Sequence, residues 1–306
     1  MTQAPLVAAD ATSAATSPTA DATPKQDRAL GLDLLGLLPF AAYLLIFLGA
    51  PTVAVVVGAF TDDNGHPTLD NITAALGSPY LGAFGESILI SSVTAVLGGV
   101  LGLAIAFAVA GSPANGFLRQ AVSTASGVFA YFGGVPLAFA FIATLGGQGL
   151  LTKWLADLGF SVSNSFLFGV GGIILVYLYF QIPLMVLVIF PAIEGLRPQW
   201  LEAARNLGAN RWQYWRYVGG PLLTPPVLGA LMLLFANAFA SYATAEALTN
   251  GVIPLVPIEI GNVMSGNVAA GEENLGNALG FGMIIIVAIA MVGYTLTQRK
   301  AARWMR

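Results

Sequence analysis

The 306-residue sequence has no cysteine, a single histidine (His66) and few charges. Without cysteine there are no disulfides, no cysteine-bound zinc sites and no iron–sulfur clusters. Charged residues make up 9% of the chain and hydrophobic residues 57%, against about 25% and about 45–50% in ordinary soluble domains. This composition excludes a water-soluble globular protein, and so many apolar side chains also argue against disorder.

The scarcity of reactive side chains bears on function as well. With 12 basic and 15 acidic residues the net charge is −3, which is too balanced to indicate a nucleic-acid partner. One loop histidine, no cysteine and no buried acidic pair leave an intramembrane enzyme without nucleophilic or acid–base machinery. We therefore expect no enzymatic activity and no metal site.

Long uncharged stretches dominate the rest of the sequence. A transmembrane helix needs about 20 mainly apolar residues, and continuous apolar runs without alternation favour helices over a barrel. The sequence thus predicts an all-α membrane protein with six transmembrane helices. The predicted spans are residues 34–60, 87–110, 123–147, 167–193, 222–245 and 277–297. An amphipathic stretch at residues 150–158 predicts a further short helix on the outer interface.

Glycine and proline are frequent within these spans, with 36 and 17 in the whole chain. Gly133, Gly134 and Pro136, for example, lie close together in the third span. In a membrane such residues allow close helix packing or a kink. Both interpretations stay open for this cluster.

The first 30 residues differ in composition from everything that follows. They consist largely of Ala, Thr, Ser, Pro and Asp without a hydrophobic run, which predicts a disordered tail. The first long apolar run begins at Leu34 and is too long for the core of a signal peptide. We expect the tail to remain in the mature protein, ahead of a transmembrane domain that covers residues 31–306.

Positive charge is distributed unequally between the two sides of the predicted spans. Eleven Lys and Arg residues fall on the side of both termini, against Lys153 alone on the other. The rule that loops rich in Lys and Arg stay inside predicts cytoplasmic termini and a cytoplasmic fourth loop. The eleven are Lys25, Arg28, Arg119, Arg197, Arg205, Arg211, Arg216, Arg299, Lys300, Arg303 and Arg306.

The fourth loop, residues 195–221, has strong helix signals. Pro198 suits the first position of a helix, Glu202 suits its positive end, and Gly208 suits a left-handed stop. These signals predict a helix of about 10 residues. One face of it carries a small apolar surface formed by Trp200, Ala204 and Leu207.

A second helix is predicted in the same loop. Asn210 can cap a helix that begins at Arg211 and runs to about residue 218, before Gly219, Gly220 and Pro221 lead into the fifth span. The aromatic and basic side chains of this helix suit the membrane headgroup level. Those side chains are Arg211, Trp212, Trp215 and Arg216.

The spacing within this loop resembles the signature of the inner-membrane permease subunits of binding-protein-dependent ABC importers. That signature is Glu-Ala-Ala, three residues, Gly, nine residues, Ile, one residue and Leu-Pro. Here it reads Glu202-Ala203-Ala204, then Gly208, then Val218 and Gly220-Pro221 with every interval kept. Val218 and Gly220 replace the usual Ile and Leu.

The resemblance implies that the loop is a coupling helix that docks on an ATPase subunit. Ala203, Ala204 and Leu207 would form the contact, Glu202 a charge-assisted interaction, and Gly208 the angle between the two helices. The resemblance further implies an ATPase subunit dimer, a second permease, an extracytoplasmic solute-binding protein and a bacterial inner-membrane location. No Lys is preceded by Gly, so the chain lacks a phosphate-binding loop and we expect ATP and Mg²⁺ to bind the partner ATPase.

The stretch from Leu234 to the C-terminus looks most like the spermidine/putrescine branch of the family. Related branches carry ferric iron, thiamine or phosphonates, and these stay open as alternatives. Polar residues within spans face a cavity or another helix, and for a cation Tyr242 offers a ring face and Glu246 a carboxylate. The candidate pathway residues are Gln181, Asn237, Ser241, Tyr242 and Glu246.

An ion-coupled secondary transporter is a remote alternative. It needs an ionisable residue near mid-membrane, whereas Glu246 lies at the outer edge of the fifth predicted span. No internal repeat supports an inverted-repeat transporter either.

Overall fold

The computed structural model describes residues 29–62, 64–113, 116–159, 164–265 and 273–303. The predicted tail falls almost entirely on residues 1–28, which lie outside the described residues. The chain divides into two compact units, Met1–Thr52 and Val53–Arg306. This division falls inside the first predicted span, and the boundary expected near residue 30 stays a prediction.

The first unit contains the start of the first span. Helix α1 (Ala29–Leu44) continues through a π-helical turn, η1 (Leu45–Gly49), into α2 (Ala50–Ala59). The Thr52 hydroxyl donates to the carbonyl oxygen of Leu48 at 2.7 Å, and the rings of Tyr43 and Phe47 lie 4.9 Å apart. Polar groups are thus satisfied within the helix, as a lipid environment requires.

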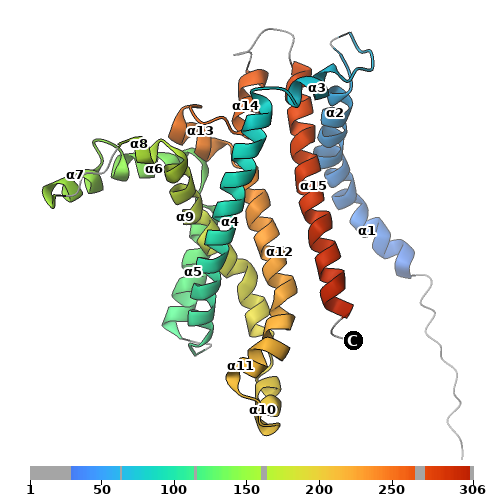
Figure 1. Cartoon of the computed structure of the whole chain (residues 1–306). Helices are drawn as coiled ribbons and strands as arrows, with labels where there is room; N and C mark the ends of the chain where they lie inside the picture. Colours follow the sequence, from blue (N-terminus) through green and yellow to red (C-terminus); the bar gives the residue numbers. More distant parts are fainter. Residues whose placement is uncertain (1–28, 63, 114–115, 160–163, 266–272, 304–306) are drawn as a thin grey trace, which may run out of the picture. The chain divides into compact units, whose positions relative to one another are not determined.

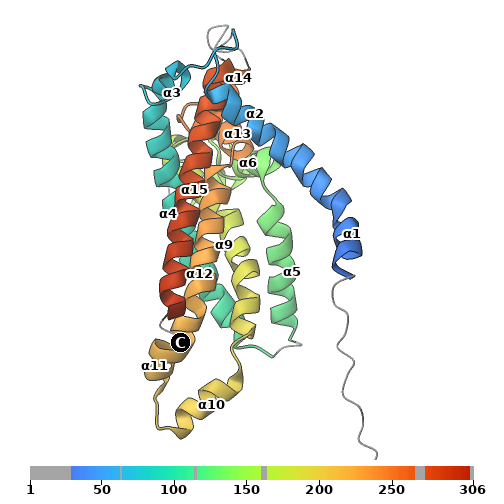
Figure 2. The ribbon, with the colours of Figure 1, turned by 90° about the vertical axis from the view of Figure 1, so that its right-hand side faces the viewer.

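The described part of the second unit is helical, with a single isolated β-bridge between Thr61 and Pro67. Its long helices lie side by side in Figures 1 and 2. In chain order its elements after α2 are α3 (Asp70–Ala75), α4 (Tyr80–Ala110), α5 (Phe117–Tyr131), α6 (Gly134–Leu145), α7 (Leu150–Asp157), α8 (Asn164–Leu167), α9 (Val170–Glu194), α10 (Pro198–Asn206), α11 (Arg211–Tyr214), η2 (Trp215–Gly219), α12 (Gly220–Phe239), α13 (Ala243–Thr249), α14 (Val256–Met264) and α15 (Glu273–Arg303).

Six helical segments among the described residues are long and apolar enough to cross a membrane, which confirms the predicted fold class. The segments overlap the six predicted spans in order, and their boundaries differ by up to 11 residues. They are Leu37–Ala59, Tyr80–Ala110, Gly134–Asp157, Val170–Glu194, Arg211–Phe239 and Asn274–Leu296. The largest shift is in the third segment, which begins at Gly134 and includes residues 150–157. The short helix predicted at residues 150–158 is also present, as α7.

Helix α9 occupies the centre of the second unit and packs against α4, α5 and α12. Its close approach to α4 depends on glycine. A Cβ atom at Gly98 would lie 2.7 Å from the Cβ of Gln181, and one at Gly102 would lie 2.6 Å from the carbonyl oxygen of Ile182. Small residues let helix backbones approach closely in a membrane, so these glycines have the packing role.

The stretches predicted as the third and fifth spans, residues 123–147 and 222–245, are interrupted, whereas the sequence predicted a continuous helix for each. In the third span α5 ends at Tyr131 and α6 begins at Gly134. Gly134 has φ +72°, a conformation that costs little only for glycine. In the fifth span α12 ends at Phe239 and α13 begins at Ala243. The apolar composition of a stretch predicts how long a membrane span is, but it does not show where the helix is interrupted.

The two breaks contact each other and the central helix. The backbone N–H of Gly134 donates to the Thr244 hydroxyl at 2.8 Å, and the Tyr177 hydroxyl of α9 donates to the carbonyl oxygen of Ser241 at 2.8 Å. Backbone groups freed at a break need partners because lipid supplies none. The polar side chains of α9 and α13 provide two such partners.

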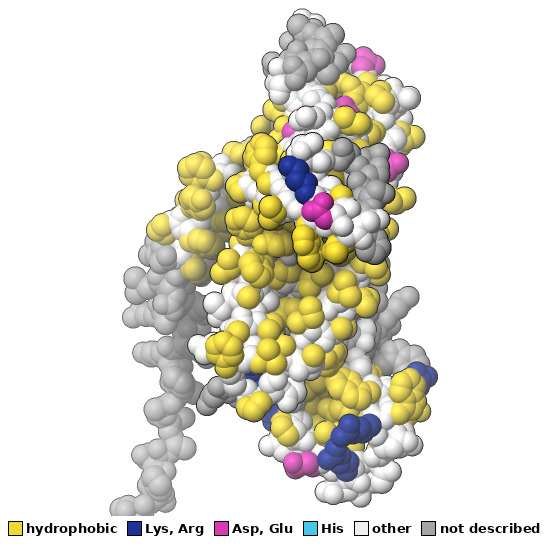
Figure 3. Space-filling view, turned by 90° about the vertical axis from the view of Figure 1, so that its left-hand side faces the viewer, with side chains coloured by type: hydrophobic (Ala, Val, Ile, Leu, Met, Phe, Trp, Pro, Cys, Tyr) yellow, Lys and Arg dark blue, Asp and Glu magenta, His cyan; other side chains and the backbone are white. Residues whose placement is uncertain are grey.

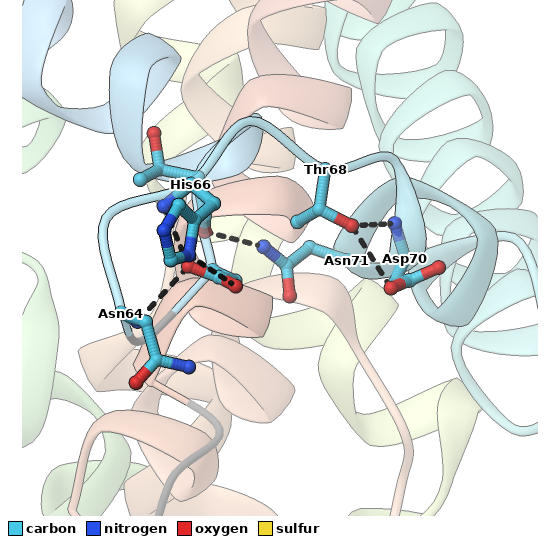
Figure 4. A network of polar contacts seen from close by, with 7 residues as sticks. Asn64, His66, Thr68, Asp70 and Asn71 are labelled. Atoms are coloured by element: carbon cyan, nitrogen blue, oxygen red, sulfur yellow. Dashed lines mark hydrogen bonds and ion pairs between the residues drawn. The ribbon is translucent and has the colours of Figure 1, made fainter.

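A compact loop joins α2 to α3, at the end of the second unit opposite α10 (Figure 4). Asp62 Oδ1 accepts hydrogen bonds from the backbone N–H groups of Asn64 and His66, at 2.9 and 2.7 Å. The Asn71 amide donates to the carbonyl oxygen of Thr61 at 2.9 Å. The hydrogen bond from His66 lowers the pKa of the Asp62 carboxyl, because it stabilises the charged form. His66 is therefore part of a loop network.

Charged side chains lie mainly toward the two ends of the helix bundle. On the face drawn in Figure 3, charged side chains lie toward the two ends, and a broad apolar region lies between them. An uncharged middle and charged ends are what a membrane-spanning bundle requires.

Candidate functional site

The loop between α9 and α12 carries the sequence signature, and the structure shows it as two helices that extend beyond the bundle (Figures 1 and 2). Helix α10 begins at Pro198, in the first helical turn as predicted, and ends at Asn206. Proline suits this position because its missing N–H would have had no partner. Glu202, Ala203 and Ala204 thus lie in the middle of a regular helix. The expectation that Glu202 lies at the positive end of the helix is wrong, because the first turn of α10 contains no acidic residue.

A left-handed glycine ends α10. Gly208 has φ +78°, and its N–H donates to the carbonyl oxygen of Arg205 at 2.9 Å. The N–H of Ala209 donates to the carbonyl oxygen of Ala204 at 2.9 Å. The chain therefore turns sharply here while the last carbonyl groups of α10 keep partners. A Cβ at Gly208 would meet nothing within 4 Å in the part of the chain that the structure describes, so the turn is open on this side.

The second helix begins with a capping box, which confirms Asn210 as its cap. The Asn210 side chain accepts from the N–H of Gln213, and the Gln213 side chain accepts from the N–H of Asn210, both at 2.8 Å. The predicted end near residue 218 is wrong. The chain continues from α11 through the π-helical η2 into α12, because Gly219, Gly220 and Pro221 are accommodated in helical conformation. α11, η2 and α12 form one continuous connection.

Aromatic contacts fix this connection to the bundle. The Trp215 ring lies edge-on to Phe107 of α4, with centroids 5.3 Å apart, and Tyr214 is buried. A Cβ at Gly219 would lie 2.8 Å from the Trp215 ring, so glycine allows the ring to pack here. Trp215 was predicted to lie at the headgroup level, and the structure adds a tertiary contact to α4.

The tip of the loop exposes a small apolar surface. Leu207 is 88% exposed, although leucine is among the most frequently buried residue types. Trp200 is also exposed, and Ala204 is half-buried. A rigid helix with small residues and one exposed leucine can enter a cleft of another protein. Arg197 and Arg205 flank this surface in the sequence.

The predicted pathway residues lie in the bundle, and one of them serves helix packing. Gln181 of α9 is fully buried, and its Nε2 donates to the Thr94 hydroxyl of α4 at 3.1 Å. Its Oε1 is also buried and has no hydrogen-bond partner in the described part of the chain. A role for Gln181 in a pathway stays a prediction.

Three of the predicted residues gather at the break in the fifth span. Asn237 lies in the last turn of α12 and is exposed, Ser241 is half-buried within the break, and Tyr242 precedes α13 with 43% of its surface exposed. A Cβ at Gly261 of α14 would lie 2.9 Å from the Tyr242 ring. The break therefore brings these polar side chains next to an irregular backbone segment.

Glu246 lies one helical turn beyond the break, in α13. Its Oε2 atom is buried, and no hydrogen-bond partner for it exists among the residues that the structure describes. An unpartnered buried carboxylate oxygen is costly. Glu246 is thus suited to receive a cationic or hydrogen-bonding group from outside the chain.

Sequence reasoning missed one hydrogen-bonding side chain at the breaks. The Tyr177 hydroxyl donates to the backbone carbonyl of Ser241. Its sequence signal was a polar atom within an apolar run, as for Gln181. The sequence does not show its role, because its partner lies on an element distant in sequence.

The family comparison agrees with the site. Residues 98–306 match the family described as binding-protein-dependent transport system inner membrane component. This match includes the whole loop and five of the six candidate spans, the second of them in part. The chain belongs to this family. It is a multi-pass protein of the bacterial inner membrane.

Individual relatives of this permease-family chain are similar over part of their length. The spermidine/putrescine transport system permease protein PotB of Haemophilus influenzae is 30% identical over 152 residues, which is 49% of this chain and 52% of the relative. The sulfate transport system permease protein CysT of Escherichia coli is 27% identical over 172 residues, 56% of this chain and 59% of the relative. Other relatives are named for thiamine and ferric transport. The chain thus spans about half or less of the first curated relatives it matches, and their names describe permeases rather than enzymes.

Solved structures support the fold of this family member. A bacterial alginate ABC transporter in complex with an alginate pentasaccharide-bound periplasmic protein has a chain that superposes with a TM-score of 0.69. That comparison covers 90% of this chain and 96% of the other at 17% identity. It shows a shared architecture.

Proposed function

We propose that this chain is the permease subunit of an ATP-driven importer and forms half of its transport pathway together with a second permease. Two ATPase subunits supply the energy, and a solute-binding protein delivers the cargo from the other side. Family membership supports this role. The observation that carries it is the helical loop tip at α10, which continues through α11 and η2 into α12.

The coupling mechanism follows from that continuity. Ala203, Ala204 and Leu207 would contact the ATPase cleft, and Glu202 would add a charge-assisted hydrogen bond. Motion of α10 would reach the membrane through the α11–η2–α12 connection, which Trp215 holds against α4. ATP and Mg²⁺ would bind the ATPase subunits.

The orientation of the chain is part of the proposal. The loop tip and its basic residues would face the cytoplasm with both termini, in accord with the distribution of Lys and Arg. The end that holds α3 and α14 would then face outward, where a solute-binding protein docks.

A single cysteine at Leu207 is expected to cross-link to the ATPase subunit. Because the natural sequence has no cysteine, Leu207→Cys gives one reactive thiol at an exposed position of the loop tip. The measurement is the cross-linked band between permease and ATPase after treatment of the purified complex with a bifunctional thiol–amine reagent. Val252→Cys is the control, since Val252 is exposed but follows α13. Equal cross-linking from both positions, or none from Leu207→Cys, would contradict docking at α10.

For the cargo we propose a polyamine-like organic cation. The unpartnered carboxylate oxygen of Glu246 and the exposed ring of Tyr242 support this choice, because ammonium groups bind carboxylates and aromatic faces. The similarity to PotB points the same way. The alternatives are ferric iron, thiamine, phosphonate or another small solute.

Neutralising Glu246 is expected to reduce polyamine uptake while leaving the complex intact. Glu246→Gln keeps the shape of the side chain but removes the charge that attracts a cation, so uptake should fall by roughly five- to ten-fold, which corresponds to about 1–1.4 kcal/mol. The measurement is spermidine uptake into proteoliposomes that hold the full complex. Glu259→Gln in α14 is the matched control. Unchanged uptake in Glu246→Gln would exclude a role for its charge.

The solute-binding protein offers an independent test of the cargo. It should co-purify with the permease complex, and spermidine or putrescine should raise its melting temperature, because a ligand that binds only the folded state stabilises it. Stabilisation by a sugar, an amino acid or sulfate, without any by polyamines, would overturn the choice of cargo and leave the permease role unaffected.

A further inference from the structure

The exposed surface of α5 divides lengthwise into a polar half and an apolar half. At 100° per residue, the polar residues fall within an arc of roughly 100°, and the apolar ones occupy the adjoining arc. Gln120, Ser123, Thr124 and Tyr131 belong to the polar half together with Gly127. The exposed apolar side chains are Phe117, Leu118, Val128 and Phe129.

The remaining side of α5 packs against α9. Ser126 on that side is 5% exposed. Phe129, at the edge of the apolar half, has its ring 5.6 Å from that of Tyr179 of α9. Helix packing therefore uses a third face and leaves the polar half uncovered by this unit. Figures 1 and 2 show α5 beside α9.

A cavity lies at the α10 end of the polar half. Its volume is about 590 Å³. Gln120, Ser123 and Thr124 of α5 line one side of it, and the α9 side is mainly apolar, with Val186, Leu187, Phe190 and Pro191. The Arg119 guanidinium forms an ion pair with Glu194 at the end of α9 and lies 5.0 Å from the centre of the Phe190 ring. The polar half of α5 thus leads into this cavity, and the Arg119–Glu194 ion pair lies at its border.

The two halves of α5 suit different surroundings. Val128 and Leu118 suit lipid, whereas exposed hydroxyl and amide groups in hydrocarbon lose their hydrogen bonds with water. A lipid-facing helix would be apolar on its whole exposed surface, and α5 is apolar on only half of it. The polar half, which is continuous with the cavity, is therefore suited to water.

We propose that the polar half of α5 is this chain's wall of a water-filled transport pathway, which takes hydrated solutes without selecting the sign of their charge. This inference rests on the proposed function. The wall carries hydroxyl and amide groups, which both donate and accept hydrogen bonds, and the Arg119–Glu194 pair at its end is balanced in charge. Discrimination between solutes then belongs to other elements, such as α13 or the solute-binding protein.

The absence of cysteine makes this proposal directly testable in the assembled complex. Single variants Ser123→Cys and Thr124→Cys place a thiol on the polar half, Leu118→Cys and Val128→Cys place one on the apolar half, and Ser126→Cys is the buried control. The complex is reconstituted in lipid nanodiscs and treated with a cationic or an anionic membrane-impermeant methanethiosulfonate. The modification rate of each thiol is measured by mass spectrometry.

Cysteines at 123 and 124 are expected to react at least about ten-fold faster than those at 118, 126 and 128, because the thiolate that reacts forms in water. The cationic and anionic reagents should react with them at rates within about five-fold of each other, since the wall is uncharged. Equally slow reaction at all five positions would overturn the proposal, because it would mean that the polar half is not in contact with water. A strong preference for one reagent would overturn the charge-neutral wall.

The outcome is separable from that of the proposed function. If the cysteines at 123 and 124 react fast but Leu207→Cys does not cross-link to the ATPase, the aqueous wall is supported and ATPase coupling at α10 is contradicted. If Leu207→Cys cross-links but the cysteines at 123 and 124 react slowly, the importer role is supported and the aqueous wall is contradicted.

Discussion

Replacing Gly208 by tryptophan is expected to abolish ATP-driven uptake and to leave the six-span fold intact. Gly208 has φ +78°, which costs roughly 1–2 kcal/mol for a residue with a Cβ. Among the described residues, no atom lies within 4 Å of the added Cβ, so the side chain would project outward, toward the proposed ATPase contact. Uptake into proteoliposomes, with the melting temperature of the purified permease measured in parallel, checks both parts of the expectation.

The structure supplies a matched control for this substitution. Gly159, after α7, has φ +86° and the same open surroundings, so Gly159→Trp carries a similar backbone cost away from α10 and should keep its uptake. Glu202→Lys tests the same docking surface without disturbing the backbone and should lower ATP-driven uptake strongly. Normal uptake in both Gly208→Trp and Glu202→Lys would refute the coupling role of α10.

Replacing Gly102 by valine is expected to prevent correct folding. A Cβ at Gly102 would lie 2.5 Å from the Cβ of Met185 and 2.6 Å from the carbonyl oxygen of Ile182, so α4 and α9 would have to separate. Overpacking costs typically about 1–3 kcal/mol in a protein core, and here the obstacle includes backbone. We expect a loss of monodisperse protein in size-exclusion chromatography and a melting temperature lowered by several degrees or more.

A second glycine of α4 provides the comparison. Gly85 lies on the same helix, and a Cβ there would meet nothing within 4 Å. Gly85→Val therefore tests the effect of valine in this helix without a clash and should behave like the natural protein. If Gly102→Val and Gly85→Val have the same melting temperature, close α4–α9 packing does not stabilise the fold.

The loop signature was the most predictable part of the site. Pro198, Gly208 and Asn210 act on neighbouring backbone groups, so their conformations follow from local chemistry, and the structure places all three as expected. The end of the second helix was not predictable. Two glycines and a proline usually end a helix, yet here η2 and α12 continue through them. Trp215 of η2 packs against Phe107 of α4, a tertiary contact that the loop sequence does not show.

The breaks in the spans lay beyond sequence reasoning for a related reason. Gly133 and Gly134 permitted either packing or a kink, and the kink is the observed result. Its acceptor is the Thr244 hydroxyl, which is 110 residues away. A hydrogen bond between such distant positions leaves no pattern in either segment alone.

The sequence by itself determined that this protein lies in the membrane, crosses it six times and carries a helical loop with a Glu-Ala-Ala signature. Those properties depend on composition, on the length of apolar runs and on local capping, all of which act over one or two helical turns. Only the tertiary structure decided which polar side chains bond to other helices, which remain without a partner, and which half of α5 is polar and uncovered. These properties depend on contacts between helices, and hydropathy does not specify which faces meet.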